Sequence, residues 1–128
     1  MRDKMSTHRN RELKNLWRKY VSESSVINYK EICRRIAASP ASRFFIGVDH
    51  AFNLVSRIAR GEPPIKTNPL RRKMHADLYN KVRSIIDRRP HLELRDAVAE
   101  AVYSQAPSFY LTWQSIYVIL CKTKRQSK

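Results

Sequence analysis

The chain has 128 residues, and an apolar share of 42% is too large for a disordered tail. Only two glycines occur and strand-type alternation is scarce, which favours helices. Twenty-six Lys and Arg stand against eleven Asp and Glu, and the surplus is +7 over residues 1–63 and +8 over residues 64–128. This even split excludes a neutral domain with a basic tail. Because the excess positive charges repel one another unless a polyanion neutralises them, nucleic acid is the predicted partner.

The first half of the chain predicts three helices after a short arm. Residues 1–9 are polar and charged, and we interpret them as a flexible basic arm. Apolar residues then recur at helical spacing from about residue 10 to residue 22, and again from a predicted N-cap at Asn28 to about residue 38. A tight loop with aromatic residues should follow. A third helix is expected from residue 47 or 48 to residue 60, with Gly61 as its stop signal.

The second half predicts the same elements again. Three prolines mark residues 62–70 as a linker. Helices are expected over residues 71–87, 93–103 and 112–123, the last of them capped by Thr112. A short apolar run leaves a strand over residues 113–121 as the alternative to a helix there. Residues 126–128 form a basic tail.

An internal repeat organises these elements. Residues 12–60 align without a gap on residues 77–125, with seven identical residues at a shift of 65 positions. The apolar positions keep their helical phase, with one exception at Lys81. A repeat of this length is a supersecondary unit used twice. We therefore expect an all-α protein of two tandem trihelical, helix-turn-helix-like repeats, residues 10–61 and 71–125, packed as one compact domain.

Aromatic and sulfur-containing side chains fall mainly on apolar positions of the predicted helices. We expect four aromatic side chains in the core: Trp17, Phe52, Trp113 and Tyr117. Buried free thiols are the favoured interpretation of Cys33 and Cys121, and a disulfide between the two repeats is the less favoured alternative.

Basic and amide side chains suggest where nucleic acid would bind. Asn53 and Arg57 lie beside the apolar stripe of the predicted third helix, and Asn and Arg are the residues that read adenine and guanine edges. Arg71, Arg72 and Lys73 begin a predicted helix, where their charge opposes the helix dipole, so we expect them to contact phosphates. The candidate contacts are Arg43, His50, Asn53, Arg57, Arg60, Arg71, Arg72, Lys73, Lys122 and Arg125.

Catalytic and metal-binding patterns are lacking in the sequence. No phosphate-binding loop, HExxH, CxxC or GxSxG motif occurs, and the four histidines are scattered. We therefore expect neither an enzyme nor a metal site or other cofactor. Without a secretory signal or an apolar run that could span a bilayer, the expected location is the cytoplasm.

The segments "SPASRFFI" and "SQAPSFYLTWQSIYVIL" resemble small uncharacterised basic proteins of bacterial mobile elements, and in outline helix-turn-helix modules. The resemblance covers about residues 28–60 and 93–125 and implies a DNA-linked context. The predicted function is DNA binding, as a small transcriptional or architectural regulator. The alternatives are RNA binding, or an adaptor that docks on an acidic partner or an anionic membrane surface. A homodimer through the helix over residues 112–123 is a further expectation.

Overall fold

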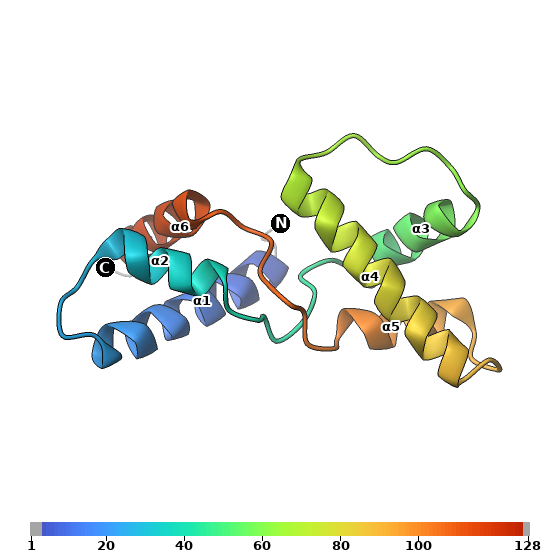
Figure 1. Cartoon of the computed structure of the whole chain (residues 1–128), viewed down its shortest axis with the longest axis horizontal. Coiled ribbons are helices and arrows are strands. Elements are labelled where there is room, and N and C mark those ends of the chain that lie inside the picture. The colour runs from blue at the N-terminus through green and yellow to red at the C-terminus, as the bar shows by residue number, and fades with distance from the viewer. Residues whose placement is uncertain (1–3, 127–128) are drawn as a thin grey trace. The chain divides into compact units, whose positions relative to one another are not determined.

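The computed structural model describes the backbone of residues 4–126 and the side chains of residues 5–122. This range contains helices and no strand, so the all-α class is confirmed and residues 113–121 are helical. No helix in this range is long and apolar enough to cross a membrane. The helices are α1 (Lys4–Glu23), α2 (Tyr29–Ala37), α3 (Val48–Ala59), α4 (Pro69–Arg88), α5 (Leu94–Val102) and α6 (Trp113–Gln126), as Figure 1 shows.

The helices repeat with the same shift as the sequence. Helices α1 and α4 begin and end 65 positions apart, and so do α2 and α5. Helices α3 and α6 begin 65 positions apart, and only their ends differ. The apolar pattern that repeats in the sequence thus corresponds to helices that repeat in the structure.

Side-chain caps explain several of these helix starts. The Asn28 side chain accepts a hydrogen bond from the Glu31 amide at 3.1 Å, as predicted, and the Thr112 hydroxyl accepts one from the Ser115 amide at 3.1 Å. Asn68 caps α4 in the same way, with Pro69 in the first turn. Gly61, with φ of +74°, follows α3 as the predicted stop signal.

Three boundaries differ from the sequence-based expectation. Helix α1 begins at Lys4, so residues 4–9 are helical rather than a flexible arm. Helix α4 begins at Pro69, inside the expected linker, because the Asn68 cap satisfies its first turn. Helix α6 continues to Gln126, into the expected tail. Residues 1–3 and 127–128 lie outside the described residues.

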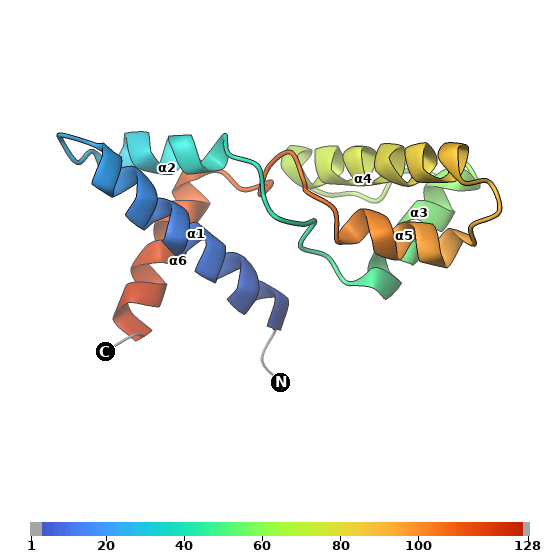
Figure 2. The same ribbon diagram turned by 90° about the horizontal axis from the view of Figure 1, so that it is seen from below.

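The chain folds into two compact units that do not coincide with the two repeats. Unit 1 comprises residues 1–41 and 107–128, and unit 2 comprises residues 42–106. Unit 1 therefore packs α6 with α1 and α2, and unit 2 packs α3 with α4 and α5 (Figure 2). Each unit takes two helices from one repeat and the third helix from the other. The expected packing of two trihelical repeats as one compact domain is not confirmed.

Each unit has an apolar core of its own. In unit 1 the most deeply buried aliphatic side chains come from all three helices: Leu13, Ile36 and Ile116. In unit 2 they are Leu78, Val82, Ile85, Val98 and Val102, with Val55 from α3. In the loops that precede α3 and α6, Phe44 and Phe109 are buried.

The four aromatic side chains expected in the core are not buried there, and that prediction is wrong. Trp17, Phe52 and Trp113 are half-buried, and Tyr117 is 42% exposed. They border the apolar stripes rather than occupying their centres. Both cysteines are free and lie in unit 1. Burial is the larger cause that raises the pKa of the Cys33 thiol, and the neighbouring Cys121 raises it further.

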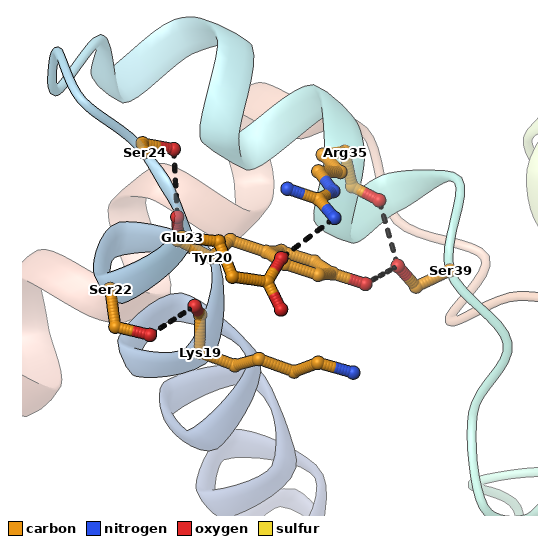
Figure 3. A network of polar contacts seen from close by, with 7 residues as sticks. All are labelled: Lys19, Tyr20, Ser22, Glu23, Ser24, Arg35 and Ser39. Carbon is orange, nitrogen blue, oxygen red and sulfur yellow. Dashed lines mark hydrogen bonds and ion pairs between the residues drawn. The ribbon is translucent and has the colours of Figure 1, made fainter.

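Polar contacts join α1 to α2 in unit 1 (Figure 3). The hydroxyl oxygens of Tyr20 and Ser39 lie 2.7 Å apart, and the Ser39 hydroxyl donates to the Arg35 carbonyl oxygen at 2.8 Å. The Arg35 guanidinium lies 3.9 Å from the centroid of the Tyr20 ring and pairs with Glu23 at 2.9 Å. This cluster covers the Tyr20 ring with a cation and satisfies its hydroxyl.

Candidate nucleic-acid interface

Several predicted contact residues of unit 2 lie on α3 and near the start of α4, two helices that pack against each other. His50 and Asn53 are exposed on α3, and Arg71, Arg72 and Lys73 are exposed on α4. His75, one turn further along α4, lies near charged groups of both helices. Burial lowers the pKa of His75, and the charges of Arg71 and His50 lower it further. Half of the predicted contact residues are therefore exposed on these two helices, and we refer to these five residues as the α3–α4 surface.

Arg57 and Arg60, also predicted to contact nucleic acid, are instead engaged with Glu62. Arg57 Nη1 lies 3.2 Å from Glu62 Oε1, and Arg60 Nε donates to Glu62 Oε2. Arg57 Nη2 also donates to the Pro63 carbonyl oxygen at 3.4 Å, and its Nε is buried without a hydrogen-bond partner. One carboxylate thus holds both guanidinium groups against the segment that follows α3.

The Arg43 side chain forms hydrogen bonds within its own loop. Its Nε donates to the Phe44 carbonyl oxygen and its Nη2 to the Ile46 carbonyl oxygen, each at 3.0 Å. Its guanidinium also lies 4.4 Å from the centroid of the Tyr103 ring. Two of its five N–H donors are thus used within the loop, and the side chain is half-buried rather than fully exposed.

The remaining predicted residues belong to unit 1. Lys122 is exposed on α6. Arg125 lies on the same helix, but its side chain is outside the described residues. The ten candidates are thus divided between the two units, eight in unit 2 and two in unit 1, and within unit 2 Arg57 and Arg72 line the same pocket as His75.

Charge is distributed unevenly between the units. Unit 1 has fourteen Lys and Arg against four Asp and Glu, a net +10, whereas unit 2 has twelve against seven, a net +5. The even split between sequence halves conceals this difference, because α6 joins the first two helices of the other repeat. In unit 2, three carboxylates are engaged in ion pairs: Asp49 with Arg95, Glu62 with Arg57 and Arg60, and Glu100 with Arg89.

Within the described residues, no group of three or more His, Cys, Asp or Glu is placed to hold a metal ion. Comparison with known proteins gives no assignment: no protein family, no curated protein and no solved structure was found to match the chain. The candidate site therefore depends on the geometry and charge of this chain alone.

Proposed function

We propose that the protein binds nucleic acid, duplex DNA in preference to RNA, as a small regulatory or architectural factor. One observation carries the proposal: Arg71, Arg72 and Lys73 are adjacent and exposed within the first five residues of α4. The positive end of the helix dipole adds to their charge, which is unfavourable unless an anion lies nearby. A row of phosphates is such an anion, and the release of its counterions would drive binding.

Exposed neighbours support a contact with the backbone of nucleic acid. His50 and Asn53 on α3 add further exposed hydrogen-bonding groups, and unit 2 as a whole is positively charged. Phosphate contacts position a protein on a duplex without reading its sequence. Clustered Arg and Lys on α4 therefore supply affinity, and Asn53 is the residue of this surface suited to read a base.

Fluorescence anisotropy with labelled duplex DNA tests the proposal. Replacing Arg71, Arg72 and Lys73 by Ala should weaken binding to every duplex alike. It should also flatten the slope of log affinity against log salt by roughly 0.9 for each phosphate that the variant no longer binds. The matched control replaces Arg83, Arg88 and Arg89 by Ala, which removes the same charge from the other half of α4 and the residue that follows it, and should have the smaller effect.

Absence of binding to both duplex DNA and structured RNA at low salt would reject the proposal. Competition between the two nucleic acids tests the preference. Duplex DNA should displace the labelled probe at lower concentration than RNA, and the reverse order would make RNA the partner.

A further inference from the structure

Unit 1 contains a cavity of about 570 Å³ between α1, α6 and the start of α2. Three aromatic residues line it, Trp17, Tyr29 and Tyr117, and so do two cationic residues of α1, Lys14 and Arg18. The rest of the lining is apolar or sulfur-containing: Val21, Ile27, Leu120 and Cys121. Among the described residues no carboxylate lines the cavity, so its charged groups are suited to an anion.

The aromatic rings form two walls at an angle. The Trp17 and Tyr29 rings are stacked, with centroids 5.3 Å apart and planes 6° apart. The Tyr117 ring meets Tyr29 edge-on, with centroids 6.2 Å apart and planes at 69°. Tyr29 is 57% exposed and Tyr117 is 42% exposed. A flat ring entering the cavity would therefore find exposed aromatic surface on two sides.

The equivalent site in unit 2 lacks the stacked pair of rings, and Tyr79 occupies the position of Lys14. The repeat places Val82 at the position of Trp17 and Leu94 at that of Tyr29, and Val82 is 1% exposed. Two residues of the aromatic set are thus aliphatic in the other copy. The trihelical fold therefore forms without the stacked pair of rings.

Phe52 corresponds to Tyr117 and is covered in unit 2. The Arg95 guanidinium lies 4.5 Å from the centroid of the Phe52 ring and donates to the Asp49 carboxylate at 2.7 Å. In unit 1 the repeat places Lys30 at the position of Arg95, and its ammonium lies 5.5 Å from the Trp113 ring centroid. The Tyr117 ring of unit 1 is therefore accessible, whereas a cation covers the equivalent Phe52 ring of unit 2.

We propose that this cavity binds an unpaired base of a nucleic acid strand, with Lys14 and Arg18 binding the adjoining phosphates. Every base has a π face that stacks on aromatic side chains whatever its sequence. The volume is in the usual range of ligand sites. The two cations and the net +10 of unit 1 disfavour a cationic ligand, which aromatic cages otherwise suit. This inference rests on the proposed nucleic-acid binding and adds that unit 1 binds a strand with unpaired bases.

Fluorescence of Trp17 gives a direct readout. The chain has two tryptophans, so Trp113→Phe leaves Trp17 as the only one, and Trp113 does not line the cavity. A short single-stranded oligonucleotide should quench Trp17. An abasic strand of equal length and charge should bind more weakly and leave the fluorescence nearly unchanged. This comparison needs no change in the cavity and so does not depend on the folding of a cavity variant.

Two substitutions borrowed from the repeat sharpen the test. Tyr29→Leu introduces the residue that unit 2 has at this position and should weaken single-strand binding roughly 5- to 150-fold, the expected range for removing one ring that stacks on a base. Tyr117→Phe introduces the unit 2 residue but keeps the ring, and should change affinity less than about twofold. Binding of duplex DNA should be nearly the same in both variants.

The outcomes separate this inference from the proposed function. Equal affinity for normal and abasic strands without quenching, while salt-dependent binding remains, would overturn the base site and leave nucleic-acid binding intact. No binding to either strand or to duplex DNA would reject both. A dimer in sedimentation analysis that dissociates on Tyr29→Leu would show that a second copy of the chain occupies the cavity, which would also overturn the base site.

Discussion

The Tyr20 hydroxyl donates a hydrogen bond to the Ser39 hydroxyl, because the single proton of Ser39 goes to the Arg35 carbonyl oxygen. The bond is buried and joins α1 to Ser39, the second residue after the end of α2. At the equivalent positions of unit 2, Ile85 and Ser104 cannot form it. The two units thus differ at this position: unit 1 has a hydrogen bond there, and unit 2 has an aliphatic side chain.

Tyr20→Phe should lower the free energy of unfolding by about 1 kcal/mol, since it removes the donor and leaves a buried acceptor with one partner fewer. Chemical denaturation monitored by circular dichroism measures this. Tyr103→Phe is the matched control, because Tyr103 is 64% exposed and its change should stay within about 0.5 kcal/mol. Similar losses in both variants would mean that the buried bond contributes nothing specific.

The exchange of third helices between repeats can be tested with a core residue of α6. Ile116 is fully buried, so Ile116→Ala should cost about 2–5 kcal/mol. Because α6 packs in unit 1, amide hydrogen exchange should accelerate in α1 and α2 and stay slow in α4 and α5. Mass spectrometry resolves these segments.

Leu54→Ala in α3 is the reciprocal variant, since Leu54 is 3% exposed in unit 2. It should accelerate exchange in α4 and α5 and spare α1 and α2. The opposite pattern in both variants, with each third helix protecting its own repeat, would contradict the observed units.

Helix positions could be predicted from the sequence because their signals are local. Asn28, Thr112 and Gly61 act within one turn of the helix end they define. The exchange of α3 and α6 could not be predicted, because both copies of the third helix present apolar residues at equivalent positions, such as Ala51 and Ile116. Periodicity shows that a face is buried but not against which partner helices.

The candidate contact residues also differ in whether local sequence alone determines their arrangement. The α4 group was predictable because three adjacent basic residues at a helix start remain together in any packing. The pairing of Arg57 and Arg60 was not, since it depends on how the chain turns after α3. Gly61, at φ of +74°, reverses the chain so that the Glu62 amide donates to the Arg57 carbonyl oxygen at 3.0 Å. This reversal places the Glu62 carboxylate beside both guanidinium groups.

Stability should depend on pH through His75. Its pKa in the folded protein lies below the ordinary value of 6.5, mainly because of burial. As the pH falls through 6.5, the unfolded chain binds a proton that the folded chain does not, so stability is lost toward the lower folded pKa. His75→Gln should remove this part of the pH dependence of the unfolding free energy, which denaturation at a series of pH values measures. A variant whose loss on acidification equals that of the parent would contradict this assignment.

Asn53 provides a test of base reading on the α3–α4 surface. Asn53→Ala should cost about 1–3 kcal/mol on a preferred duplex site and less on random DNA, if its amide contacts a base. Arg57→Ala should cost less than Asn53→Ala, because Arg57 is already bound by Glu62 and Pro63. Anisotropy on selected and random duplexes measures both. Equal losses on the two DNAs would assign Asn53 to the phosphate backbone.

Glu62 should act as a restraint on nucleic-acid binding. Glu62→Gln removes the carboxylate that pairs with Arg57 and Arg60, so both guanidinium groups become available to phosphates. Affinity for duplex DNA, measured by anisotropy, should rise, and the salt slope should steepen by roughly 0.9 for each additional phosphate that is bound. Stability should change by less than about 1 kcal/mol, as for other exposed pairs. Glu100→Gln alters the net charge of unit 2 equally and releases only Arg89, so it should give the smaller gain. Weaker binding by Glu62→Gln would mean that the carboxylate instead holds the two arginines in their binding position.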